Sequence, residues 1–394
     1  MVRIQQTGEP KKYRNHNTGS ITERARGKRY LIRYDRYDSN GNRKQINETV
    51  RGTKSKAEEI LAERIAVVRS GQYVDKSKAT VEQLMAQFID EYCIPPTVRL
   101  RTRHGYEGQI KRYINGSSIG RTKFQTLKPA KIRKLYADML ERGLSSTTIL
   151  HLHRLLKKAF TWAVSEDLLK EADNPTKKVN APTKAEYEME MWDIETIHRF
   201  LDVCAGSQYG DLFSFAIHTG LRRSEICGLK WDAVDMVEGR LRVVSTLHSI
   251  NGHGLVSAEP KTKKSRRTIA LAPETVKLLH GIRGRQMEHG FPTNGDSYVF
   301  IRPNGLPLIP QEVTKAFTRL VRAHNLPHMT FHGLRHAYAT LGLIAGIDSK
   351  VVSESLGHST ITITLDLYSH VMNKMKETHA QTIANLLKRE TLDT

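Results

Sequence analysis

Alternating apolar and polar positions come first along the chain, in three short runs. The runs cover residues 19–26, 28–35 and 43–50, and Asn40-Gly41 marks a hairpin turn between the last two. Successive side chains of a strand point to opposite faces, so Tyr30, Ile32 and Tyr34 share one face of the second run. The opposite face carries Arg29, Leu31 and Arg33. A helix begins at Ser55, where Glu58 completes a capping box. We therefore expect a three-stranded sheet backed by one helix within residues 1–78.

From Thr80 onward, apolar positions recur every three or four residues, which is helical spacing. The first helix begins at Thr80 with Gln83 as its capping partner and ends before Pro95. Two more are expected over residues 102–113 and 129–142. The fourth covers residues 145–166 and has a buried stripe formed by Ile149, Leu152, Leu155, Leu156, Ala159, Phe160 and Ala163. Its basic residues, off or at the edge of that stripe, are either a solvated face or phosphate contacts: Arg154, Lys157 and Lys158.

Residues 174–188 lack periodicity and are rich in proline and lysine, so they predict a linker. Helices and short strands follow it. The expected helices cover residues 193–204, 209–219, 273–283, 311–325, 337–352 and a tail at 372–388. A strand at 240–247, a long loop and a returning strand at 267–271 lie among them. The fold prediction is a multidomain, mainly α protein with small β-sheets. Its domains are 1–78, 79–180 and an α+β domain at 181–394.

Charge changes this picture by pointing to a polyanionic partner. The chain has 62 Lys+Arg against 41 Asp+Glu, a net charge of +21, and residues 1–80 hold 19 Lys+Arg against 9 Asp+Glu. Three distant cysteines suit a reducing cytosol and disfavour a disulfide framework. We expect no membrane segment, because no signal peptide or apolar run of transmembrane length is evident. No phosphate-binding GxxxxGK[ST] loop supports nucleotide-driven chemistry.

Candidate chemistry gathers between residues 331 and 370. His332 and Arg335 are three positions apart, which places them on one face of a helix. Guanidinium, imidazole and phenol groups together suit phosphate chemistry, because arginine matches phosphate oxygens and a tyrosine hydroxyl can form an ester. Two less specific interpretations exist. Tyr368 can be a half-buried aromatic, and His332 with His336 can be zinc ligands. The metalloprotease form of that zinc motif needs a glutamate where this chain has Gly333.

The order of these motifs resembles the C-terminal signature of the tyrosine recombinases, which include lambda-type phage integrases and the integrases of conjugative transposons. The segments that carry the resemblance are His332-Gly333-Leu334-Arg335-His336, Leu356-Gly357-His358 and Tyr368. The family requires an arginine upstream, and Thr219-Gly220-Leu221-Arg222 supplies it. Glu225, three residues further, can support Arg222 through a salt bridge. The family also has a catalytic hairpin lysine, for which Lys261 is the best match and Lys263 and Lys264 are rivals.

The resemblance implies a set of site residues. The catalytic group would be Arg222, Lys261, His332, Arg335, His358 and Tyr368. The N-terminal sheet resembles an arm-type DNA-binding domain, and the helical unit looks like a core-binding domain. DNA contacts would come from Arg29, Arg33, Arg154, Lys157, Lys158, Lys263 and Lys264. No metal or other cofactor is implied.

The implied function is site-specific recombination of a mobile element, through a 3′-phosphotyrosyl intermediate and without ATP or metal. The partners would be double-stranded DNA with core and arm sites, further copies of the chain in a synaptic tetramer, and accessory excision or bending proteins. The tail beyond Tyr368 would dock on a neighbouring protomer. The expected location is the bacterial cytoplasm, in association with the nucleoid. Two alternatives stay open at this point: a type IB topoisomerase and a non-catalytic DNA-binding regulator.

Overall fold

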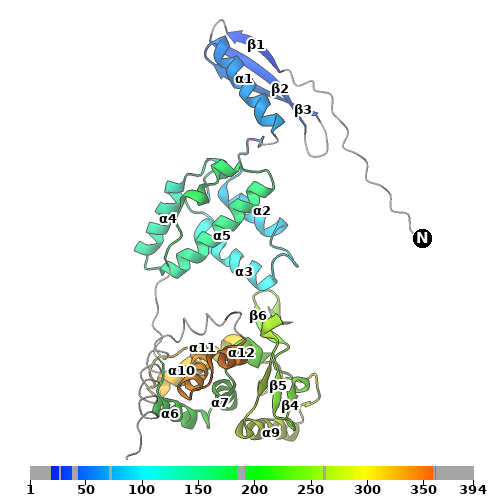
Figure 1. Ribbon diagram of the computed structural model, residues 1–394, viewed down its shortest axis with the longest axis vertical. Coiled ribbons are helices and arrows are strands. Elements are labelled where there is room, and N and C mark those ends of the chain that lie inside the picture. The colour runs from blue at the N-terminus through cyan, green and yellow to red at the C-terminus, as the bar shows by residue number, and fades with distance from the viewer. Residues whose placement is uncertain are drawn as a thin grey trace, which may run out of the picture. The chain divides into compact units, whose positions relative to one another are not determined.

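The computed structural model of this chain describes residues 19–25, 28–37, 43–70, 73–183, 191–260, 263–357 and 360. The chain forms two compact units, residues 1–186 and residues 187–394. Helices dominate both units, and each sheet is small, as Figure 1 shows. The prediction of a multidomain, mainly α fold with small β-sheets is therefore confirmed.

The N-terminal sheet consists of β1 (Ser20–Ala25), β2 (Arg29–Tyr37) and β3 (Arg43–Arg51), all antiparallel in that order. One face of β2 buries Tyr30, Ile32 and Tyr34 in a core shared with α1 (Lys54–Arg69), as the alternation predicts. The expected helix start at Ser55 is wrong. The N-cap is Thr53, whose hydroxyl accepts a hydrogen bond from the Lys56 backbone N–H, because Gly52 has already turned the chain out of β3.

A helical region follows, with α2 (Val81–Glu91), α3 (Leu100–Gln109), α4 (Pro129–Glu141) and α5 (Ser146–Ser165). The capping box of Thr80 and Gln83 is present at the start of α2. α3 continues into a π-helical turn, Ile110–Ile114, so the helical segment ends within one residue of the expected end at residue 113. The predicted stripe of α5 is buried throughout: Ile149, Leu152, Leu155, Leu156, Ala159, Phe160 and Ala163.

The first part of the expected linker at residues 174–188 belongs to this helical region, which corrects the prediction. Pro175–Lys178 forms a 3-10 turn that packs against α4 and α5. Its cause is local, because the buried Asn174 side chain accepts hydrogen bonds from both the backbone N–H and the hydroxyl of Thr176. Composition alone resembled a linker, but these bonds satisfy the polar groups that packing buries. Residues 184–190 lie outside the described residues.

The second unit contains α6 (Ile194–Cys204), α7 (Gly210–Thr219), α8 (Arg223–Cys227), α9 (Pro273–Glu288) and α10 (Pro310–Ala323). The strand expected at 240–247 is two strands in two sheets. β5 (Arg240–Arg242) pairs with β4 (Val234–Asp235) and β8 (Thr268–Ala270), whereas β6 (Thr246–Ile250) pairs with β7 (Gly254–Ala258). The expected long loop is therefore partly the turn of a β6–β7 hairpin, which Asn251-Gly252 closes.

The single helix expected at residues 337–352 is also wrong. The structure has α11 (Phe331–Ile344) and α12 (Ser349–Leu356), separated where Gly346 adopts a left-handed conformation. α11 begins six residues earlier than expected, because the Thr330 hydroxyl caps it by accepting a hydrogen bond from the Gly333 backbone N–H. His332 and Arg335 therefore do share one helix, in its first turns.

An aromatic cluster packs against the start of α11. Phe317 of α10 meets Phe213 of α7 and Phe331 of α11 edge to face, with ring centroids 5.5 and 5.7 Å apart. Phe317 is fully buried. Such pairs contribute beyond the area that they bury. Because Phe331 directly precedes His332, the packing of this cluster fixes the end of the helix that carries His332 and Arg335.

Cys93, Cys204 and Cys227 are all buried and unbridged, and burial raises the pKa of Cys204 and of Cys227 to about 12. Among the helices of the described residues, none combines the length and the hydropathy that a membrane crossing requires.

Replacing Phe317 by Ala should lower the free energy of unfolding by about 3–5 kcal/mol, because it empties the centre of the aromatic cluster. Denaturant unfolding of the full chain measures this change. Val237→Ala is the control: Val237 is 93% exposed, so its replacement should change stability by no more than about 0.5 kcal/mol. Equal effects of the two substitutions would contradict the assignment of the core.

Candidate active site

Arg222 owes its position to a tight turn between α7 and α8. Gly220 ends α7 with φ 62°, a left-handed conformation that favours glycine. A Cβ atom at this position would also lie 2.6 Å from the Tyr338 ring, so no larger residue fits without a shift. The chain then reverses and presents Arg222 just before α8. The glycine of the Thr-Gly-Leu sequence before Arg222 is thus a geometric requirement of the turn.

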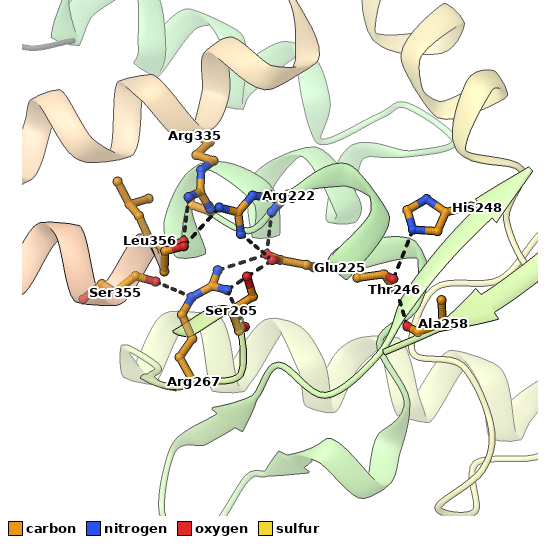
Figure 2. A network of polar contacts seen from close by, with 12 residues as sticks. Arg222, Glu225, Thr246, His248, Ala258, Ser265, Arg267, Arg335, Ser355 and Leu356 are labelled. Carbon is orange, nitrogen blue, oxygen red and sulfur yellow. Dashed lines mark hydrogen bonds and ion pairs between the residues drawn. The ribbon is translucent and has the colours of Figure 1, made fainter. Parts of the chain in front are cut away.

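Glu225 is almost fully buried, and Figure 2 shows that it accepts hydrogen bonds from two arginines. Its Oε1 lies 2.7 Å from Arg222 Nη1, and its Oε2 lies 2.9 Å from the Arg222 backbone nitrogen. The ion pair that the spacing predicts is therefore present. Burial alone would raise the pKa of the Glu225 carboxyl, but Arg267 and then Arg222 hold that pKa below its usual range. The carboxylate stays ionised at neutral pH.

The second arginine on Glu225 is Arg267, which directly precedes β8. Its Nη1 and Nη2 lie 3.1 and 2.9 Å from the two carboxylate oxygens of Glu225. Its Nε donates to the Ser355 carbonyl oxygen at 2.6 Å, near the end of α12. The side chain of Arg267 is only 6% exposed. One guanidinium thus connects β8, α8 and α12.

Arg335 connects two helix ends from the buried face of α11. Its Nη1 donates to the Gly220 carbonyl oxygen at 2.9 Å, and its Nη2 donates to the Leu356 carbonyl oxygen at 2.5 Å. Arg222 Nη2 donates to the next carbonyl oxygen, that of Gly357, at 3.2 Å. Two guanidinium groups therefore converge on the C-terminus of α12 (Figure 2), where carbonyl dipoles favour cations.

His332 lies in the first turn of α11, and its ring meets that of the buried His336 edge to face at 4.8 Å. Desolvation by the surrounding protein, then repulsion from His336, Arg335 and Arg222, lowers the pKa of His332 to about 4. The residue is nevertheless exposed to solvent, and the cationic neighbours disfavour the protonated imidazolium there. A neutral imidazole can accept a proton.

The structure brings together Arg222, Glu225, Arg335 and His332 of the predicted set. Lys261, His358 and Tyr368 lie outside the described residues, as does the tail at 372–388. Gly357, the C-cap of α12, directly precedes His358 in the chain. Lys264 is exposed, and it lines a hollow of about 500 Å³ with Arg267 and Lys350 beside the end of α12.

The expected DNA-contact residues lie on β2, on α5 and, for Lys263 and Lys264, in the 3-10 turn Lys263–Ser265. Arg29 is exposed and Arg33 half-buried on the face of β2 opposite the core. Arg154 and Lys157 are exposed on α5, whereas the Lys158 ammonium lies 5.1 Å from the centre of the Tyr92 ring, a cation–π contact within the helical region. No cluster of three or more potential metal ligands occurs among the described residues.

Sequence reasoning missed Arg267, although the strand period carries its signal. Ile269 is buried and Thr268 and Ala270 are exposed, so positions of odd number point inward along β8. Arg267 has the inward parity and Arg266 the outward one, and the Arg266 side chain is 55% exposed, paired with Glu259. An inward arginine needs a buried partner. Only the fold shows that this partner is Glu225.

Known proteins share this architecture over most of the chain. Residues 189–375 match the model of the phage integrase family. A XerC-like tyrosine recombinase of Caldanaerobacter subterraneus subsp. tengcongensis is 31% identical over 371 residues, which cover 89% of this chain and 94% of that protein. The transposase of transposon Tn916 from Enterococcus faecalis is 25% identical over 336 residues, 79% of either protein.

Solved structures give the same picture. The integrase of transposon Tn1549, solved in complex with transposon right end DNA, is 26% identical with a TM-score of 0.66 and covers 77% of this chain and 99% of its own. A lambda integrase dimer bound to a core site is 18% identical, with a TM-score of 0.56 over 73% of this chain and 95% of its own, and shares the fold.

The neutral state of His332 is open to direct measurement. In the DNA-free protein, a titration of isotope-labelled histidine by NMR should place the midpoint of His332 near a pH of about 4, not near the ordinary 6.5. Loss of one signal in His332→Gln identifies the resonance. Because the unfolded chain takes up this proton at higher pH, His332 should reduce stability as the pH falls from 6.5 towards 4. A midpoint near 6.5 would contradict the electrostatic account.

Proposed function

This chain belongs to the tyrosine recombinases of the phage integrase family, which cleave and rejoin DNA, and on that premise we propose that Tyr368 is its nucleophile. The proposed reaction is site-specific recombination of a mobile element. The observation that carries the proposal is the convergence of Arg222 and Arg335 on the end of α12, two positions before the chain reaches His358 and twelve before Tyr368.

The proposed cleavage step is a transesterification. The Tyr368 oxygen forms a bond to the phosphorus of a backbone phosphodiester, and the bond from phosphorus to the 5′-oxygen breaks. A free phenol has a pKa of about 10, so the tyrosine must lose its proton during attack. Neutral His332 accepts that proton or orients the phenol. Lys261 donates a proton to the departing 5′-oxygen. The 3′-phosphotyrosyl ester keeps the bond energy, so rejoining needs no ATP.

Arg222 and Arg335 would bind the non-bridging oxygens of the phosphate in this scheme, with His358 as a further donor. Their contacts to Glu225 and to backbone carbonyls fix both guanidinium groups before substrate arrives. Such preorganised donors stabilise the charge that develops in the transition state, and the loss of one typically costs about 10²–10³ in rate.

The proposed partner is double-stranded DNA of a mobile element, with core sites, arm sites and a target. The net charge of +21 supports a polyanionic partner, and the similar Tn1549 integrase was solved with transposon DNA. Arg29 and Arg33 would contact arm-site DNA from β2, while Arg154 and Lys157 would contact core-site phosphates from α5. We further propose a synaptic tetramer in the bacterial cytoplasm, tail docking between protomers, and accessory excision or bending proteins.

The nucleophile is tested on a nicked DNA substrate that traps the covalent product. Tyr368→Phe should retain duplex affinity and form no covalent adduct, because only the phenolic oxygen is lost. A gel that separates protein–DNA adducts in the presence of EDTA measures this. Covalent joining by the variant would contradict the proposal. Relaxation of supercoils by the wild-type protein without pairing of two sites would favour a topoisomerase.

The general acid is tested with a substrate whose leaving 5′-oxygen is replaced by sulfur. A thiolate departs without protonation, so Lys261→Ala should cleave the sulfur substrate at nearly the wild-type rate and the oxygen substrate about 10²-fold more slowly. Lys263→Ala and Lys264→Ala are the matched controls and should slow both substrates equally or neither. Selective rescue of one of these two variants would move the role of general acid to that lysine.

A further inference from the structure

We propose that Arg267 is a positioning residue for catalysis, which sets the orientation of Arg222 through Glu225 and ties it to the end of α12. The inference rests on the proposed function, because it concerns the phosphate-binding arginines of the same site. Arg267 would not touch the DNA or the reacting atoms. It acts through two neighbours: a carboxylate on α8 and a carbonyl on α12.

Burial indicates that Arg267 has a role beyond surface charge. Its side chain is 6% exposed and that of Glu225 is 3% exposed, so both charges are removed from water. A buried ion pair of this kind is often no more stabilising than an apolar pair of the same volume. Stability alone therefore gives weak reason for a buried guanidinium here. Orientation of a neighbouring group is the better physical reason.

The balance of charge around Glu225 determines how Arg267 affects Arg222. Glu225 is shared between Arg222, whose side chain is 32% exposed, and the buried Arg267. One carboxylate cannot neutralise two guanidinium groups. Arg267 contacts both carboxylate oxygens of Glu225 and leaves the Arg222 guanidinium a single hydrogen bond to that carboxylate, from Nη1. The positive charge of Arg222 is therefore only partly compensated and stays available for a phosphate.

Arg267 also fixes the end of α12 by two independent contacts. Its Nε donates to the Ser355 carbonyl oxygen, and its side chain fills the space beside Gly357. Gly357 adopts φ 65°, and a Cβ atom there would lie 3.0 Å from Arg267 Cδ. His358 follows directly in the chain, and Lys261 precedes Arg267 by six residues. One guanidinium thus holds the point from which the next catalytic segment departs.

Loss of Arg267 should release both connections. Glu225 would then be free to turn both of its oxygens to Arg222, which neutralises and reorients that guanidinium. The Ser355 carbonyl would lose a charged donor. The expected result is slower chemistry with little change in duplex affinity, because the DNA contacts proposed for β2 and α5 are untouched. A merely structural arginine would lower stability and leave the rate of the folded protein unchanged.

The experiment compares Arg267→Met with Arg266→Met in the full chain. Arg266 is the adjacent arginine, and its side chain is exposed. Its substitution by Met removes the same charge. Single-turnover formation of the covalent adduct on nicked DNA, at saturating DNA, should be slower by about 10–100-fold in Arg267→Met and within about twofold in Arg266→Met. Duplex affinity and thermal unfolding are measured on the same samples. Millimolar methylguanidinium should recover part of the lost rate through the hollow beside Arg267.

A double-mutant cycle with Glu225→Gln isolates the proposed route. Arg267→Met should cost much less in the Glu225→Gln background than in the wild type, because the carboxylate that it orients is already gone. The double variant also lacks the unpaired buried charge and keeps the protein folded if a single variant does not. Independent, multiplying effects would overturn the proposal, as would a wild-type rate in folded Arg267→Met. Adduct formation by Tyr368→Phe would instead refute the proposed function, so the two failures are distinct.

Discussion

A single buried carboxylate determines the arrangement of the proposed catalytic centre. Glu225 accepts hydrogen bonds from the backbone and side chain of Arg222 and from both terminal nitrogens of Arg267. Hydrogen bonds to guanidinium groups offset the cost of removing its charge from water, which is why its pKa stays low despite burial. The arginines are in turn held apart at defined positions, so the site has its cationic form before any substrate is bound.

The rest of the second unit places three helix ends around that carboxylate. The left-handed Gly220 ends α7, the capped Thr330 starts α11, and the left-handed Gly357 ends α12. Carbonyl oxygens at two of these ends accept hydrogen bonds from Arg335, and the aromatic cluster beneath α11 keeps the helix in place. The packing of the apolar core thereby fixes the positions of the polar groups at its edge.

Motif spacing and periodicity predicted much of this from the sequence, including the buried face of β2, the stripe of α5 and the pair of Arg222 and Glu225. The failures have local causes. Gly346 divides an apolar pattern that looked continuous, Asn174 caps a turn inside an apparent linker, and the run at 240–247 changes sheets between Arg242 and Thr246. Arg267 could not be assigned because its partner is 42 positions away in the chain, and only tertiary structure brings them together.

The buried contact between Arg267 and Glu225 also constrains how such a chain can change over generations. Losing Glu225 leaves the buried charge of Arg267 without its carboxylate, and losing Arg267 leaves the buried Glu225 with Arg222 alone. Breaking a buried ion pair typically costs about 3–5 kcal/mol, a large part of what keeps a domain folded. Losing both together removes the penalty. Substitution at these two positions must therefore pass through a destabilised single variant or occur at both positions together. Related chains should accordingly keep or lose the two residues as a pair, even where neighbouring surface residues differ.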